Sequence, residues 1–112
     1  MNTYDFTIKQ GESFIQTINF KDKNSHERIV FLDGTTAKCQ IRRHPGDSIL
    51  VQDVECEVVP ELGEITLRIS NQDTANIPPD TYNYDLALIE GGDVIYYLEG
   101  KFIVKKHVTE VV

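Results

Sequence analysis

The sequence predicts an all-β fold, an antiparallel two-sheet sandwich of about seven strands. The first observation behind this prediction is that successive segments alternate apolar and polar residues with a period of two, as strands with one buried face do. The second is that turn-forming residues separate these segments at short, regular intervals. The third is that residues 70–77 are the one helix-compatible stretch, and they are short.

The first two strands are expected in residues 4–9 and 13–20, on either side of a break at Gly11. The buried face of the first strand is expected to carry Tyr4, Phe6 and Ile8. The buried face of the second is expected to carry Phe14, Ile18 and Phe20. Residues 28–34 then form a short apolar run that ends at Gly34, which predicts a brief strand or a bulged edge.

The middle of the chain predicts three further strands, in residues 35–43, 49–59 and 64–70. The last two flank the turn "PELG" and are expected to pair as a hairpin. Their apolar stripes include the two cysteines of the chain, Cys39 and Cys56. We expect buried free thiols, because the chain opens without an export signal, and a bridge between the two remains the alternative if their strands pair.

A well-marked corner leads into the last two strands. Ser70 is expected to cap a single helical turn, which Pro78 and Pro79 prevent from continuing. Tyr82 then stands at a strand start, where its hydroxyl can reach back to an upstream backbone carbonyl. The buried stripe beyond it is expected to be Tyr84, Leu86 and Leu88.

The final strand follows the hairpin turn "EGGD", whose glycines permit positive φ. Gly100 within this strand indicates a bulge or a close approach of another backbone. The number and spacing of the strands favour an immunoglobulin-like topology, with a small barrel as the alternative. We expect one β-sandwich domain in residues 1–106 and a carboxy-terminal tail in residues 107–112.

Charge and composition narrow the classes of partner. Hydrophobic residues make up 40% of the chain and charged residues 26%, which is typical of a folded globular domain. The net charge of -7 repels both phosphate backbones and anionic lipid headgroups, so we expect neither nucleic acid nor membrane as a partner. No apolar run approaches the length needed to cross a bilayer.

No motif predicts a reaction. The three histidines, His26, His44 and His107, are isolated from one another, so we expect no metal site. Glu55 and Glu57 share the polar face of one strand, where solvated surface is the expected role. Serine nucleophiles and phosphate-binding glycine loops lack their usual context. We therefore predict no enzyme activity, no catalytic residue and no cofactor.

Tyr96 and Tyr97 are the predicted binding residues. They are adjacent in one strand and so point to opposite faces, which means that one is exposed if the other is buried. An exposed tyrosine on a sheet is a natural anchor for a partner, whereas a lone surface aromatic without a function is the alternative.

Five segments of the chain together carry a family resemblance. They are "FTIKQGESF", "GTTAKCQIRRHPGDSIL", "GEITLRIS", "IPPDTYNYDLAL" and "YYLEGKFIV". Across residues 4–105 this set resembles the immunoglobulin-like amino-terminal domain of tailed-phage baseplate upper proteins and of related small prophage tail-cluster proteins. The chain departs from that pattern at Asp80, which stands where those proteins have a glycine before the corner tyrosine.

The resemblance implies a non-enzymatic structural or adaptor module of a phage or prophage tail or baseplate. Its partners are then other phage structural proteins, with homo-oligomerisation inside a larger assembly left open. The implied location is the host cytoplasm during synthesis and the virion after assembly. A carbohydrate-binding β-sandwich module is the alternative, in which Tyr96 or Tyr97 would replace the tryptophan that usually stacks on sugars.

Overall fold

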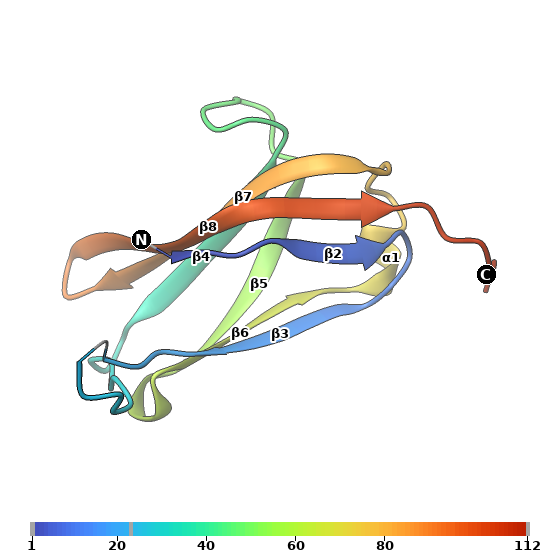
Figure 1. Cartoon of the computed structure of the whole chain (residues 1–112). Helices are drawn as coiled ribbons and strands as arrows, with labels where there is room; N and C mark the ends of the chain where they lie inside the picture. Colours follow the sequence, from blue (N-terminus) through green and yellow to red (C-terminus); the bar gives the residue numbers. More distant parts are fainter. Residues whose placement is uncertain (1, 23, 112) are drawn as a thin grey trace.

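Two facing β-sheets enclose the core in the computed structural model, which describes residues 2–22 and 24–111 (Figure 1). The elements in chain order are β1 (Asn2–Thr3), β2 (Phe6–Lys9), β3 (Phe14–Asn19), β4 (Thr36–Arg42), β5 (Gln52–Val59), the 3-10 turn η1 (Pro60–Leu62), β6 (Glu64–Ile69), α1 (Asn71–Thr74), β7 (Asp80–Glu90) and β8 (Asp93–Lys105). The all-β prediction is confirmed. In the described part of the chain no helix is long and apolar enough to cross a membrane.

Strand β5 joins the two sheets. The hydrogen-bonded order is β1-β8-β7-β4-β5-β6-β3, with β2 also paired to β8. The first residues of β5 pair with β4 and its later residues pair with β6, so the strand passes from one sheet to the other at Val54–Glu55. On the opposite side the chain crosses between the sheets from β2 to β3. The predicted sandwich is therefore present.

The prediction of a purely antiparallel sheet is wrong. β1 and β2 both run parallel to β8, with Asn2 beside Leu98 and Phe6 beside Phe102. β2 and β8 come from the two ends of the chain, so no hairpin dictates that they run in opposite directions. Alternation along a single strand carries no information about the direction of its neighbour.

Two local predictions are also wrong. Residues 28–34 form no strand apart from an isolated bridge between Arg28 and Lys21. The amide of Ile29 donates to the Phe20 carbonyl and that of Phe31 donates to the Pro60 carbonyl, so the segment meets no single neighbouring strand along its length. Tyr4 is 59% exposed, because the first strand is interrupted at residues 4–5.

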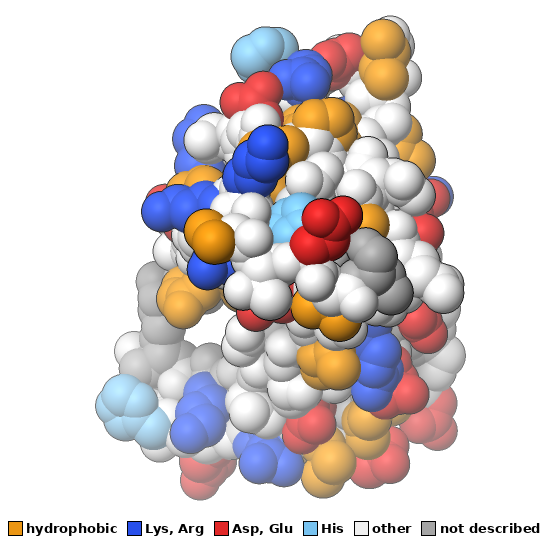
Figure 2. Space-filling model, turned by 90° about the vertical axis from the view of Figure 1, so that its right-hand side faces the viewer, with side chains coloured by type: hydrophobic (Ala, Val, Ile, Leu, Met, Phe, Trp, Pro, Cys, Tyr) orange, Lys and Arg blue, Asp and Glu red, His pale blue; other side chains and the backbone are white. Residues whose placement is uncertain are grey.

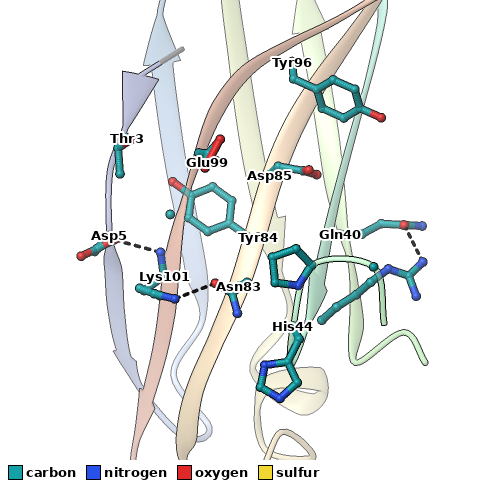
Figure 3. A pocket seen from close by; sticks show the side chains of 14 residues that line it. Thr3, Asp5, Gln40, His44, Asn83, Tyr84, Asp85, Tyr96, Glu99 and Lys101 are labelled. Atoms are coloured by element: carbon teal, nitrogen blue, oxygen red, sulfur yellow. Dashed lines mark hydrogen bonds between the residues drawn. The ribbon is translucent and has the colours of Figure 1, made fainter. Parts of the chain in front are cut away.

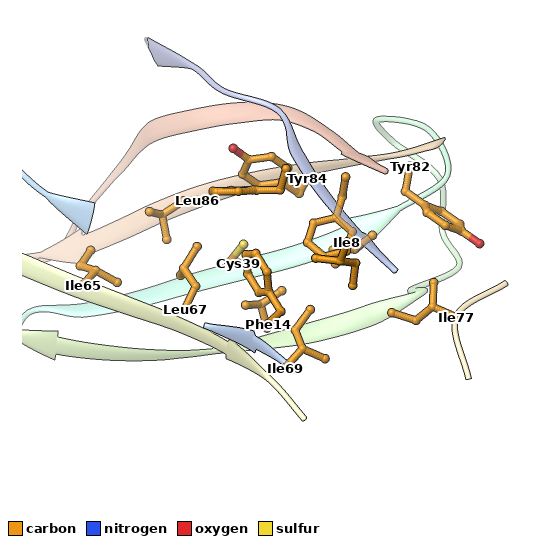
Figure 4. Packing of buried hydrophobic residues seen from close by; sticks show 14 of the residues in the cluster. Ile8, Phe14, Cys39, Ile65, Leu67, Ile69, Ile77, Tyr82, Tyr84 and Leu86 are labelled. Atoms are coloured by element: carbon orange, nitrogen blue, oxygen red, sulfur yellow. The ribbon is translucent and has the colours of Figure 1, made fainter. Parts of the chain in front are cut away.

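The other expected stripes face the core (Figure 4), where most of their residues are buried and Ile18 and Cys56 are half-buried. Aromatic rings fill the core where β2, β3, β7 and β8 meet. The Phe6 ring centroid lies 5.1 Å from both Phe14 and Tyr84, and Phe14 lies 5.2 Å from Phe102. These edge and tilted contacts fix the relative position of the two sheets on this side.

The predicted corner is confirmed. Ser70 caps α1 by accepting a hydrogen bond from the Asp73 amide at 3.1 Å. The Tyr82 hydroxyl donates to the Pro78 carbonyl, four residues upstream. The Tyr84 hydroxyl donates to the Tyr4 carbonyl, which ties β7 to the amino-terminal segment. Gly100 makes this contact possible, because a side-chain carbon at that position would overlap the Tyr4 backbone.

Candidate functional site

A β-bulge separates the environments of the two predicted binding tyrosines. On β8, Leu98 pairs with Leu86 and Tyr96 pairs with Ala87, so Tyr97 has no partner residue on β7. The extra residue turns Tyr97 toward the core, where it packs edge-on against Phe20 with ring centroids 5.1 Å apart. Tyr96 points outward and is 52% exposed. Binding by either tyrosine remains a prediction.

Tyr96 stands at one end of a hollow of about 630 Å³ on the outer face of β4, β7 and β8 (Figure 3). We call this depression the sheet hollow. Its outward-facing side chains are Gln40, Arg42, Asn83, Asp85, Tyr96, Glu99 and Lys101. The loop His44–Gly46 borders it on one side, and Thr3 and Asp5 of the amino-terminal segment border it on the other. Strands hold most of these side chains, so their positions are fixed by the register of the sheet.

Neighbouring hydrogen bonds orient the basic groups of the sheet hollow. The Arg42 guanidinium donates to the Gln40 side-chain oxygen and to the Asp47 carbonyl, each at 3.0 Å. The Lys101 ammonium donates to the Asn83 side-chain oxygen at 2.8 Å. These hydrogen bonds hold the two cationic groups in fixed orientations, which suits them to binding carboxylates or other polar acceptors.

Two carboxylates lie side by side in the same hollow. Asp85 and Glu99 are directly paired across β7 and β8, an arrangement that brings like charges together. Partial burial raises the pKa of the Asp85 carboxyl, the nearby Glu99 raises it further, and Arg42 opposes both effects. The hollow thus carries charges of both signs.

A small apolar surface adjoins the hollow on the same face of the sheet. Ile89 pairs with Val94, and Ala87 pairs with Tyr96, so these four side chains point outward together near the β7–β8 turn. Ile89, Val94 and Tyr96 are 38%, 58% and 52% exposed. We call Ile89, Val94 and Tyr96 the hairpin patch.

The remaining candidate groups stay apart. His44 borders the sheet hollow, whereas His26 lies in the loop after β3 and His107 follows β8. No group of three potential metal ligands occurs among the described residues. Glu57 lies 3.6 Å from Arg68 in an exposed ion pair. Cys39 is buried and Cys56 is half-buried, and both are free thiols, so the predicted free state is confirmed and the bridge is absent.

Sequence reasoning missed the sheet hollow. Its residues come from three strands, a loop and the amino-terminal segment, which are separate parts of the chain. Strand alternation gives the face of each residue and not which strands are neighbours. The like-charged pair Asp85–Glu99 would have been a usable signal only with the β7–β8 register and its bulge known.

The solved structures similar to this chain come from varied sources. They include CopC from Methylosinus trichosporium OB3b, with 16% identity, a TM-score of 0.42 and 67% of each chain covered. Murine CRIg has 13% identity and a TM-score of 0.43, with 92% of each chain covered. Listeria monocytogenes InlP has 18% identity and a TM-score of 0.41, and the match covers 93% of this chain and 26% of that one. With TM-scores below 0.5, these likenesses support no conclusion about this chain.

A match to a family is more informative, although no curated protein matches the chain. Residues 1–100 match the sequence model of a family described as LtfC-like, β-sandwich domain. That family is related to phage tail fibres, which fits the expected phage-associated β-sandwich. The narrower resemblance to baseplate upper proteins remains a prediction. The chain belongs to the family of LtfC-like β-sandwich domains.

Proposed function

We propose that this domain is a non-enzymatic structural or adaptor module of a phage or prophage tail or baseplate, which acts by docking other phage structural proteins. The observation that carries the proposal is the hairpin patch beside the sheet hollow. On this proposal the protein is made in the host cytoplasm and is incorporated into the virion. Nucleic acid and membrane are not its partners.

The combined surface has the composition of a protein interface. Such interfaces have an apolar centre, a polar rim and a few aromatic or arginine anchors that carry most of the binding free energy. Here Tyr96 and Val94 supply exposed apolar area, and Arg42 and Lys101 supply oriented cations within the adjoining hollow. A fitting partner presents an apolar side chain to Tyr96 and carboxylates to the two cations.

Site-specific photocrosslinking tests this proposal. A photoreactive amino acid is placed at Tyr96 in one variant and at Ile15 in the other, and each is produced in cells in which the encoding phage or prophage is induced. Ile15 is 64% exposed on β3, in the other sheet, and serves as the matched control. We expect tail or baseplate proteins to be captured from position 96 and not from position 15. Capture from both positions alike, or from neither, contradicts docking through this face.

Carbohydrate binding is the second candidate, and the sheet hollow is the observation that favours it. Fixed amide, carboxylate and cationic groups beside a tyrosine ring match the hydroxyl groups and apolar face of a sugar. A glycan array probed with the native chain and with Tyr96→Ala distinguishes the two candidates. Saturable, sugar-specific binding that is lost in Tyr96→Ala would favour this function over protein docking.

A further inference from the structure

A second, more apolar cleft lies where the two sheets separate beside β8. It has a volume of about 600 Å³. Its apolar lining comprises Ile18, Phe20 and Ile29 on one side and Ile95, Tyr97 and Leu98 on the other. Within the described chain, β1 begins to pair with β8 only at Leu98, so the preceding stretch Asp93–Tyr97 has a neighbouring strand on one side, β7.

This stretch of β8 is a suitable template for an added strand. An edge strand offers unpaired backbone N–H and C=O groups, and native proteins usually protect such edges with charged side chains. Residues 94–97 carry no charge. When an extended segment adds to an edge of this kind, main-chain hydrogen bonds supply affinity and the adjoining cleft accepts alternate side chains.

The chain itself carries a segment that fits. Residues 107–111 leave β8 in the direction of that strand and extend from the end of the molecule opposite the β7–β8 turn (Figure 1). Val108 and Val111 are 94% and 87% exposed. Fully extended, these five residues span roughly 16 Å, the length of the five-residue edge that they would cover. We propose that this segment of one copy adds to the Asp93–Tyr97 edge of β8 in the next copy, in a head-to-tail assembly.

The directions and side-chain faces agree with this assembly. When a second copy is displaced along the long axis, its tail runs parallel to β8 of the first copy. The tail then lies in line with β1 of the first copy, which is already parallel to β8. With His107 beside Asp93, Thr109 lies beside Ile95 and faces the cleft. Val108 then lies beside Val94 on the outer face and covers part of its exposed side chain.

Charge supports the same register. It places Lys105 and Lys106 next to the turn that Glu90 and Asp93 flank, so basic groups meet acidic ones. Lys and Arg side chains gather mainly on one side of the end that bears the carboxy-terminal segment (Figure 2). Donor and acceptor are different surfaces, so the contact is heterologous and produces open chains or rings rather than closed dimers. The assembly does not depend on the proposed docking function.

Sedimentation velocity of the untagged chain over a wide range of protein concentration tests the proposal. The donor variant lacks residues 107–112, and the acceptor variant is Ile95→Lys, which places a charge in the cleft. The control is Ile15→Lys, an exposed isoleucine of β3 outside the cleft. Urea melts verify that all variants fold. We expect the native chain and the control to form oligomers that grow with concentration, and each of the other two variants alone to stay monomeric.

Mixing the donor and acceptor variants gives the decisive result. The truncated chain retains an intact cleft and the Ile95→Lys chain retains an intact tail, so the mixture should form a one-to-one complex and nothing larger. A synthetic peptide of residues 105–112 should shift the backbone amide NMR signals of residues 93–97 in the truncated chain. Oligomers that persist after truncation, a native chain that stays monomeric throughout, or a peptide that shifts no signal of this edge would each overturn the proposal.

Discussion

Two pairs of tyrosines on the β7–β8 hairpin have opposite surroundings. Tyr82 and Tyr84 on β7 are 0% and 5% exposed, and their hydroxyls donate to backbone carbonyls. Tyr96 on β8 is 52% exposed and Tyr97 is half-buried, and neither hydroxyl has a hydrogen-bond partner within the described residues. The same side chain therefore fixes the fold in one strand and remains free for contact in the next.

The two pairs differ in whether a hydrogen-bond acceptor lies beside the tyrosine hydroxyl. A buried tyrosine needs a partner for its O–H, and the corner and the amino-terminal segment each supply a carbonyl. Near the β7–β8 turn, Tyr96 points outward, and no carbonyl of a described residue accepts a hydrogen bond from its hydroxyl. Mutations at matched positions should therefore separate stability from binding.

The largest contrast is expected between Tyr84→Ala and Tyr96→Ala. Removing the Tyr84 ring opens a cavity beside Phe6 and Cys39, so the free energy of unfolding should fall by about 3–5 kcal/mol. Tyr96→Ala should change it by less than about 0.5 kcal/mol. Urea melts of both variants measure the contrast. Equal losses would mean that Tyr96 is part of the core and not of a contact surface.

A smaller contrast concerns the hydroxyl groups alone. Tyr82→Phe removes the hydrogen bond to the Pro78 carbonyl and should lower the free energy of unfolding by about 1 kcal/mol. Tyr97→Phe removes a hydroxyl without such a bond and should leave it nearly unchanged. Urea melts of the two variants make the comparison, and a loss at Tyr97 as large as that at Tyr82 would contradict it.

We call the surroundings of Tyr82 and Tyr84 the packed region and those of Tyr96 and Tyr97 the contact region. The packed region was more predictable from the sequence than the contact region. Strand alternation located the buried stripes, proline and tyrosine located the corner, and Gly100 indicated the close approach that the Tyr4 backbone makes. Each of these signals is local, because a residue type and its spacing suffice to predict it.

The contact region was less predictable because it depends on register and on distant pairing. The bulge at Tyr97 comes from a mismatch between two strands that no single segment reveals. The parallel placement of β1 beside β8 joins the two ends of the chain. The sheet hollow and the β8 edge that no described strand covers both follow from these long-range pairings.

Alkaline pH should lower the free energy of unfolding through two buried groups of the packed region, Cys39 and Tyr84. Burial raises the pKa of the Cys39 thiol above its ordinary value of 9.0, and burial likewise raises the pKa of the Tyr84 hydroxyl. The unfolded chain then loses these protons at lower pH than the folded chain does. Stability is therefore retained below about pH 9 and lost as the pH rises further, by about 1 kcal/mol near pH 10 for Cys39.

Urea melts from neutral pH to about pH 10 measure this loss, with Cys39→Ala as the control. The variant starts from a lower stability, but its free energy of unfolding should fall less steeply with pH. Thiol titration provides a second measurement: the native chain should react slowly, and the denatured chain should show two reactive thiols. A native chain whose stability is constant over this range would contradict the buried, protonated state of Cys39.

The smallest expected effect is a gain in the free energy of unfolding rather than a loss. It comes from a substitution in the sheet hollow, beside Tyr96. Asp85 and Glu99 repel each other across the β7–β8 pair, and burial together with Glu99 raises the pKa of Asp85. The folded state thus disfavours the ionised carboxylate, so Asp85→Asn should raise the free energy of unfolding at neutral pH by a few tenths of a kcal/mol. Because a raised pKa means stability that is present at low pH and lost as the pH rises through the acidic range, this gain should vanish below the ordinary Asp pKa of 3.8.

Glu99→Gln is the matched control, and the double variant should gain less than the sum of the two single gains, because either change alone relieves the repulsion. A gain at neutral pH means that the sheet hollow keeps an unfavourable charge pair that the fold does not need, as expected where a surface is shaped for contact rather than for stability. Urea melts of the three variants at neutral and acidic pH provide the measurement. If Asp85→Asn instead lowers the stability at neutral pH, the Asp85 carboxylate is stabilised by Arg42, and the hollow belongs with the packed region as part of the scaffold.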